Sequence, residues 1–171
     1  ALGGTYGLSE IVTKAIPLTL TALGGLICYK MLIWNIGAEG QLCLGAIATT
    51  AVVRYCFVDS WPVMFVLMFL AAAIAGGLWC MIAGVLKAKW NVNETITTLM
   101  LNYIGINLSE YFIYGPWKDP MSMGFPFTPN FPEAARLWVF GTTRIHGGIF
   151  VALAIAVIFH LILKRSKWGY E

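Results

Sequence analysis

An uncharged apolar run from Val63 to Leu86 constrains the fold of this chain more than any other feature. The run has roughly 24 residues, and a helix needs about 20 apolar residues to cross the hydrocarbon core of a bilayer. Hydrophobic residues make up 59% of the chain and charged residues 11%, whereas soluble domains carry about 25% charged residues. Because the apolar runs are continuous and lack the alternation of a β-barrel, they predict an all-α integral membrane protein.

Other segments predict further helices around this run. Leu8 to Lys14 predicts an amphipathic lead-in, and Ala15 to Trp34 predicts a first span of roughly 20 residues. Leu42 to Val53 supplies only about 12 apolar residues, which favours a broken or re-entrant helix. A helix from Asn91 to Tyr114 and a final span from Gly148 to Leu163 bring the expected total to about five transmembrane or broken helices.

Two basic clusters predict the orientation of the spans. A tight loop from Lys87 to Trp90 follows the long run, and a second cluster at residues 164–167 follows the final span. Lysine and arginine beside spans prefer the cytoplasm, so both clusters predict the inner side. The proline-rich connection from Gly115 to Gly148 is then outside, and the chain begins outside, which leads us to expect a longer protein with one more helix before residue 1.

Small residues recur within the long run at the spacing of one helical turn. Ala72 with Gly76, and Ala73 with Gly77, form small-xxx-small pairs. Such pairs let two helix backbones approach closely, so this helix is expected to pack on a neighbour.

A polar break from Asn35 to Gln41 interrupts the apolar sequence between the first two helices. An ionisable residue between two hydrophobic segments suggests a functional site, so Asn35, Glu39 and Gln41 are candidates for a solute pathway. The simpler interpretation is a cytoplasmic turn between helices, with Glu39 in the first turn of the second helix, where a carboxylate complements the helix dipole.

A polar stripe follows in the helix that begins after Asn91. Glu94, Thr98, Asn102, Gly105 and Ser109 recur at steps of three and four, which places them on one face. The stripe either bonds this helix to others or lines a hydrated solute path. At its start, Asn91 is expected to cap the helix while Glu94 reaches back as in a capping box.

Several classes of function have no support in the sequence. There is no Gly-x-x-x-x-Gly-Lys-Ser/Thr phosphate loop, no His-Glu-x-x-His motif, no Ser/His/Asp set and no paired carboxylates suited to catalysis. The four cysteines lie in apolar stretches without Cys-x-x-Cys spacing, so no metal site is expected. The formal charge of +3 is too small to suggest nucleic acid. We therefore expect neither catalytic residues nor a bound cofactor.

Three stretches together resemble the membrane permease subunits of bacterial ATP-binding-cassette (ABC) importers in the ribose and branched-chain amino acid permease superfamily, nearest to the nucleoside or simple-sugar type. They are Trp34 to Gln41, reading Trp-Asn-Ile-Gly-Ala-Glu-Gly-Gln, then Leu86 to Tyr103, reading Leu-Lys-Ala-Lys-Trp-Asn-Val-Asn-Glu-Thr-Ile-Thr-Thr-Leu-Met-Leu-Asn-Tyr, then Gly115 to Pro120, reading Gly-Pro-Trp-Lys-Asp-Pro. The resemblance covers nearly the whole chain in the same order.

The resemblance implies that residues 1–171 are one transmembrane permease domain, the N-terminal half of a subunit of about ten helices, truncated at both ends. It implies alternating-access import of a nucleoside or related sugar-containing solute across the bacterial cell membrane. The implied partners are a cytoplasmic ATPase that uses the ATP, an extracytoplasmic solute-binding protein or lipoprotein, a second permease subunit and membrane lipid. The ATPase-docking side would begin at Trp168, Gly169, Tyr170 and Glu171. The alternatives are a permease for ribose-like sugars or another small polar solute, and a secondary transporter or channel.

Overall fold

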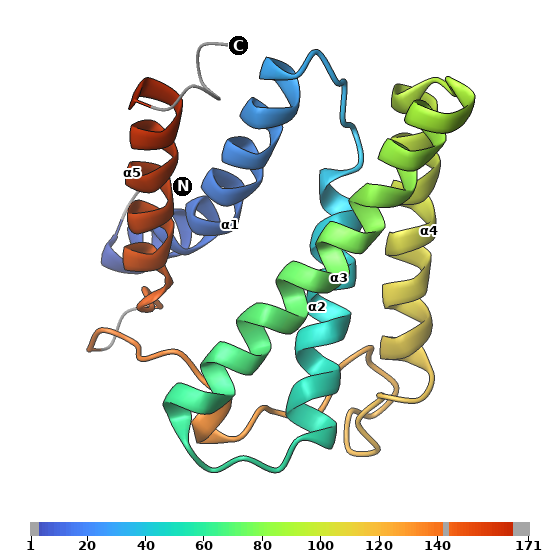
Figure 1. Cartoon of the computed structure of the whole chain (residues 1–171). Coiled ribbons are helices and arrows are strands. Elements are labelled where there is room, and N and C mark those ends of the chain that lie inside the picture. Colours follow the sequence, from blue (N-terminus) through green and yellow to red (C-terminus); the bar gives the residue numbers. More distant parts are fainter. Residues whose placement is uncertain (1–3, 142–143, 166–171) are drawn as a thin grey trace. The chain divides into compact units, whose positions relative to one another are not determined.

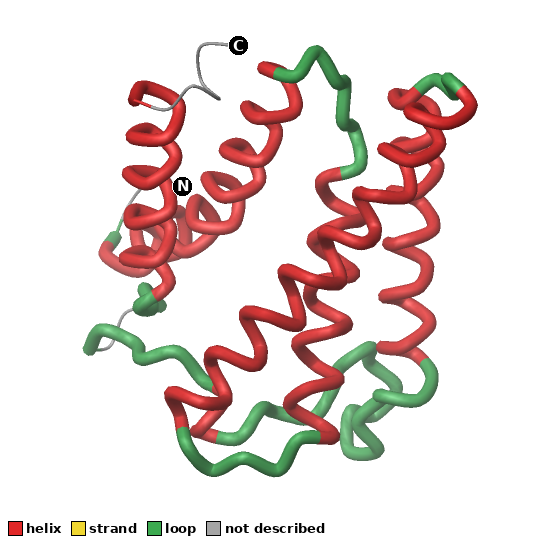
Figure 2. The backbone as a smooth tube through the Cα atoms, in the orientation of Figure 1, coloured by secondary structure: helices red, strands yellow, loops and turns green. Residues whose placement is uncertain are grey.

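The computed structural model describes residues 4–141 and 144–165, and these residues form five α-helices and one short 3-10 helix (Figure 1). The helices are α1 (Thr5–Lys30), α2 (Ala38–Tyr55), α3 (Trp61–Trp90), α4 (Glu94–Tyr114), the 3-10 helix η1 (Glu133–Ala135) and α5 (Gly148–Arg165). The predicted all-α fold is confirmed. The described residues between α4 and α5 are almost entirely loop, as the prolines of this connection predict (Figure 2).

Three of the described helices are long and apolar enough to cross a membrane. They are Tyr6–Lys30 with mean hydropathy 1.7, Trp61–Trp90 with 2.3, and Gly148–Arg165 with 2.0. None of the apolar window of α3 is buried inside the chain, so its side chains are left for lipid or for another helix. This uncovered apolar surface is what distinguishes an integral membrane protein from a soluble helical bundle.

Several helix boundaries differ from the sequence prediction. The expected lead-in and first span form one continuous helix, α1, which ends at Lys30 and not at Trp34 as predicted. Helix α2 begins at Ala38, inside the predicted break. The predicted loop from Lys87 to Trp90 is instead the last turn of α3. Lysines in that turn complement the negative end of the helix dipole, which favours helix over loop.

The junction between α3 and α4 also corrects the predicted cap. Asn91 ends α3 in the left-handed region with φ 51°, whereas Asn93 is the N-cap of α4 and its Oδ1 accepts from the N–H groups of Thr95 and Ile96. Asparagine suits both positions, since it tolerates positive φ and its side chain caps well, so two closely spaced asparagines left the assignment ambiguous. Glu94 does not form the capping box but pairs with Lys87, Nζ to Oε2 2.9 Å.

Replacing Asn93 with alanine is expected to destabilise α4 by about 1 kcal/mol, because it removes the side-chain acceptor for the first turn. Asn91→Gly is the matched control, because glycine adopts the left-handed region at no steric cost. Thermal unfolding in detergent, followed by circular dichroism, compares the two. Equal melting temperatures for both variants would contradict the assignment of the cap.

The described chain divides into two units. One comprises residues 4–27, 137–141 and 144–165, and contains most of α1 with α5. The other comprises residues 28–136, in which α2 contacts both α3 and α4, and η1 contacts α3. Within this second unit, the start of α2, the end of α3 and the start of α4 lie toward one end, and the opposite termini lie toward the other (Figure 1).

Candidate functional site

The candidate site is built around the start of α2. Its N-cap is Gly37, which has no side chain to accept from the first turn of the helix. Asn35 turns the backbone just before α2, because its Oδ1 accepts a hydrogen bond from Gly37 N at 2.9 Å. The amides of Asn35 and Gln41 lie side by side and donate to each other, Asn35 Nδ2 to Gln41 Oε1 at 3.5 Å and Gln41 Nε2 to Asn35 Oδ1 at 3.4 Å.

Side chains of α4 supply the acceptors that the start of α2 lacks. Gly40 N donates to Asn102 Oδ1, and Ile36 N donates to Thr98 Oγ1 at 3.2 Å. Thr98 Oγ1 itself donates to Thr95 O at 3.1 Å, so the hydroxyl is used in both directions. The first turn of a helix has N–H groups without intrahelical partners, and here Asn102 of the neighbouring helix caps that of Gly40. Thr98 holds Ile36, the residue just before the N-cap Gly37.

Three glycines allow this close approach. A Cβ at Gly37 would lie 2.9 Å from Thr98 O, and one at Gly40 would lie 2.8 Å from Asn102 Cα. From the opposite side, a Cβ at Gly105 would lie 2.9 Å from Gly40 Cα. Because these neighbours are backbone atoms, which cannot swing aside, the α2–α4 contact requires glycine at these positions.

Helix α3 packs on the other side of α2 and also reaches α4. A Cβ at Gly45 would lie 3.6 Å from Ala72 Cβ, and one at Gly76 would lie 3.3 Å from Gln41 O, so the predicted close packing is confirmed for the Ala72 and Gly76 pair. The Cβ position of Gly77 has nothing within 4 Å. Trp79 Nε1 donates to Leu101 O at 3.2 Å, which ties α3 to α4 beside the glycine contact.

The site lies within the first half of α4. With a rise of about 1.5 Å per residue, Thr98 is about 6 Å and Asn102 about 12 Å along the axis from Glu94. Both side chains are buried, with exposed fractions of 3% and 9%. The start of α2 therefore packs against α4 one to two turns after α4 begins, and not at its first residue.

The structure brings together some of the sequence-predicted site residues and separates others. Asn35, Gln41, Thr98 and Asn102 gather at the start of α2. Glu39 is exposed on the first turn of α2, where it complements the helix dipole. Glu94 is the first residue of α4 and pairs with Lys87. Ser109 is half-buried further along α4. Trp168, Gly169, Tyr170 and Glu171 lie outside the described residues.

The predicted shared face of α4 is confirmed for Thr98, Asn102 and Gly105, which are all buried. What the sequence analysis missed is the partner of this face, above all the backbone N–H groups of Ile36 and Gly40 and the indole of Trp79. The repeated glycines at 37, 40 and 105 were the available signal, because glycine on helices often marks a close approach of backbones.

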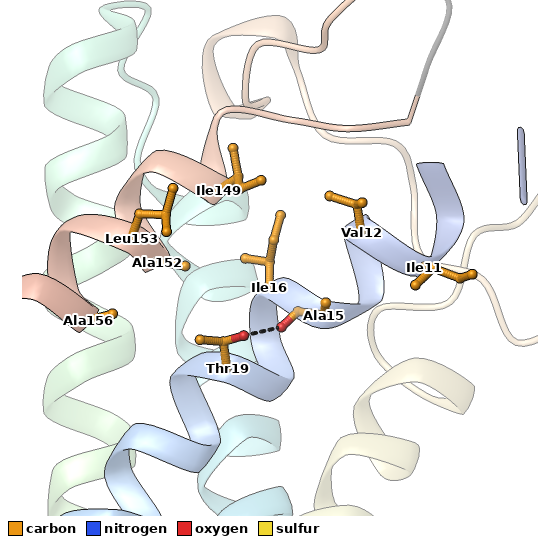
Figure 3. Close-up of a pocket in the computed structure, with 9 residues that line it drawn as sticks. All are labelled: Ile11, Val12, Ala15, Ile16, Thr19, Ile149, Ala152, Leu153 and Ala156. Atoms are coloured by element: carbon orange, nitrogen blue, oxygen red, sulfur yellow. Dashed lines mark hydrogen bonds between the residues drawn. The ribbon is translucent and has the colours of Figure 1, made fainter. Parts of the chain in front are cut away.

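The unit that contains α1 and α5 holds an apolar cavity of about 280 Å³ (Figure 3). Its lining is aliphatic except for Thr19, whose hydroxyl donates to Ala15 O in its own helix at 2.8 Å. The lining therefore offers no free polar group to a sugar or a nucleoside. Among the described residues, no cluster of three or more His, Cys, Asp or Glu side chains is placed to hold a metal ion.

The loop before α5 is fastened to α1 by charge. Arg144 pairs with the Glu10 carboxylate, its carbonyl accepts from Thr13 Oγ1 at 3.0 Å, and its guanidinium lies over the ring of Tyr6. The hydrogen bond that the Arg144 guanidinium donates to the Glu10 carboxylate raises the pKa of Arg144, with smaller contributions from Tyr6 and from the charge of Glu10. The guanidinium stays charged under all physiological conditions, so it can pair with Glu10 whenever that carboxylate is ionised.

Comparison with known proteins decides the family. The family model described as branched-chain amino acid transport system, permease component, matches residues 7–171. The chain belongs to this permease family. The family consists of transporter permeases, which is not a class of enzyme, and its members are membrane proteins. The resemblance inferred from the three sequence motifs is therefore confirmed.

Several curated relatives of this permease chain are ABC transporter permeases. The chain is 36% identical to the glucose ABC transporter permease protein of Haloferax volcanii, over 99% of the chain and 47% of that protein. It is 34% identical to the guanosine ABC transporter permease protein of Bacillus subtilis, over 99% of the chain and 49% of that protein. It is 27% identical to a nucleoside ABC transporter permease protein of Lactococcus lactis subsp. cremoris, over 100% of the chain and 49% of that protein.

The permease chain thus spans about half the length of the curated relatives it matches. No solved structure matches it.

Proposed function

We propose that this chain forms part of the membrane permease subunit of an ABC importer that moves a nucleoside or a related sugar-containing solute into the cell. The observation that carries the proposal is the match over 99% or more of the chain to relatives named for glucose, guanosine and nucleosides. These solutes are polar and uncharged under physiological conditions, and they share hydroxyl groups or a sugar ring, which amide and hydroxyl side chains bind without a fixed counter-charge.

The proposed solute pathway runs beside the start of α2, at Asn35, Glu39 and Gln41. Asn35 and Gln41 bond to each other through long amide contacts of 3.4 and 3.5 Å, which a solute hydroxyl competes with easily. Thr98 and Asn102 are already used to cap α2, so we propose that they position the pathway and do not line it. Glu94 and Ser109 lie on the same helix, and we propose that they border the pathway without binding the solute.

Alternating access then requires movement of α2 against α4. The glycine contact between the helices is narrow and held by few side-chain hydrogen bonds, so it suits a hinge between two packed arrangements. Energy for this movement comes, in this proposal, from a separate cytoplasmic ATPase, and this chain itself holds no cofactor. Trp168 to Glu171 are proposed to face that ATPase. An extracytoplasmic solute-binding protein and a second permease subunit complete the importer in the bacterial cell membrane, which the subunit crosses several times.

A sugar permease is the second candidate. It is favoured by the 36% identity to the relative named for glucose. A secondary transporter is less well supported, because it needs an ion-coupling carboxylate buried in the middle of a span. Glu39, the candidate for that role, is exposed on the first turn of α2.

Uptake of radiolabelled guanosine tests the proposal. The permease that contains this chain is produced together with its ATPase and binding protein in cells that lack their own nucleoside uptake, and uptake is competed with unlabelled nucleosides, glucose, ribose and leucine. We expect inhibition by nucleosides and loss of uptake when the ATPase is inactivated. Stronger inhibition by glucose or ribose would move the assignment to a sugar permease, and uptake that persists with an inactive ATPase would overturn the ABC assignment.

A further inference from the structure

The loop that follows α4 exposes a group of large apolar side chains. Met121 and Met123 are 88% and 96% exposed, and Phe125 and Phe127 are 64% and 61% exposed. The sequence from Pro120 to Pro132 contains no charged residue. Four large apolar side chains within seven residues of one loop form an exposed patch that needs a partner of apolar or interfacial character.

Each end of this loop is held by a helix, the start by α4 and the far end by α3. At its start, Trp117 is buried and stacks on Phe112 of α4 with ring centroids 4.4 Å apart. At its far end, the indole of Trp61, the first residue of α3, donates to Arg136 O at 3.0 Å. Helix α3 is the most apolar of the candidate spans, and tryptophan favours the boundary between lipid and water, so we place Trp61 at that boundary. The far end of the loop is then held close to it.

The backbone of the loop supplies most of its own hydrogen-bond acceptors. Asp119 N donates to Phe127 O at 2.8 Å and closes the loop, while Met121 N donates to Asp119 Oδ1 at 2.9 Å. Ser122 N donates to Asp119 O and Phe125 N to Ser122 O, and prolines at 120 and 126 have no N–H to satisfy. A non-helical backbone at the edge of a bilayer has little water to bond with, so it is favoured when its N–H groups find acceptors within the loop, as these do.

We propose that the segment Met121 to Phe127, called here the apolar tip, inserts into the headgroup layer of the membrane. It would anchor to lipid the end of the permease at which α3 begins and α4 ends. The apolar tip has no charged side chain that could select a protein partner by charge, and its one polar side chain is that of Ser122. Methionine and phenylalanine, in contrast, partition into the interfacial region without a specific partner. This proposal is independent of the solute that the permease carries.

Depth measurement by nitroxide spin labels tests the proposal in the permease that contains this chain, reconstituted into phospholipid vesicles. The labels are placed in a variant without native cysteines, at Met123→Cys and separately at Met121→Cys, with Glu133→Cys as the control. Glu133 is exposed in the same connection and is charged, so its label is expected in water. Collision with oxygen reports lipid, and collision with a water-soluble nickel chelate reports water.

We expect the labels at 121 and 123 to lie about 5–10 Å into the boundary between headgroups and acyl chains, and the label at 133 to collide freely with the nickel chelate. Nickel accessibility at 121 and 123 equal to that at 133 would overturn the proposal. Protection of these labels only after the solute-binding protein is added would also overturn it, in favour of a protein-docking loop. Having two label positions guards against a local effect of one substitution.

Discussion

A Gly40→Ala permease is expected to lose about 1–3 kcal/mol of stability, because the added methyl group meets backbone atoms of α4 that cannot move aside. The new Cβ would lie 2.8 Å from Asn102 Cα and 3.1 Å from Leu101 O. Separation of the helices would also lengthen the bond from Gly40 N to Asn102 Oδ1. Uptake is expected to fall with stability, since the hinge between α2 and α4 is distorted.

Gly77→Ala is the matched control for this prediction. Gly77 is also a helical glycine, but nothing lies within 4 Å of its Cβ position. Alanine is favoured over glycine within a helix by roughly 0.5–1 kcal/mol, so this variant is expected to be as stable as the parent or slightly more stable. Thermal unfolding in detergent measures the stability of the Gly40→Ala and Gly77→Ala variants. Equal stability of the two variants would contradict the close approach at Gly40.

Replacing Asn102 with leucine is the second substitution for which a large effect is expected. It removes the acceptor of Gly40 N at a buried position, and a buried N–H without a partner costs about 1–3 kcal/mol. Membrane insertion is expected to remain intact, because leucine is more apolar than asparagine. Uptake is expected to fall through a lower maximal rate with KM unchanged, since Asn102 positions α2 and is not proposed to contact the solute.

Asn107→Leu provides the comparison on the same helix. Asn107 is exposed, and its amide donates only to Tyr103 O, one turn earlier in α4, at 2.7 Å. Its replacement is expected to leave uptake and stability near the parent values. A raised KM in Asn102→Leu would place this side chain in the solute pathway, and unchanged uptake would remove it from the mechanism altogether.

The sequence predicted the face of α4 but not its partner. Steps of three and four residues specify which side chains of a helix share a face, so Thr98, Asn102 and Gly105 were grouped correctly. Periodicity within one helix carries no information about which other helix covers that face. The cap of α2 by Asn102 depends on contacts between residues about sixty positions apart, and only the folded chain specifies them.

Local ambiguity explains the remaining differences. Asn91 and Asn93 both suit a helix end, and only the observed φ of 51° at Asn91 separates the two roles. The basic sequence from Lys87 to Trp90 was predicted as loop, yet it completes α3, because lysine is a good helix former and is favoured in a last turn. The long uncharged run of α3 and the proline-rich connection were predicted correctly, since each is determined by composition alone.

Hydrogen exchange at the start of α2 tests the central claim most directly, namely that the polar break is held against α4. In the unmodified permease in lipid nanodiscs, mass spectrometry compares the amides of residues 36–41 with those of the turn at residues 57–60. The amides of Ile36, Gly37, Gly40 and Gln41 all donate hydrogen bonds, whereas only Val58 donates one in that turn.

We expect residues 36–41 to exchange at least about tenfold more slowly than the turn, where each factor of ten corresponds to about 1.4 kcal/mol of opening free energy. Asn102→Leu should then remove the protection at Gly40 and leave that at Gln41. Exchange of residues 36–41 as fast as that of residues 57–60 would contradict the account, because it would place the break in water and away from α4.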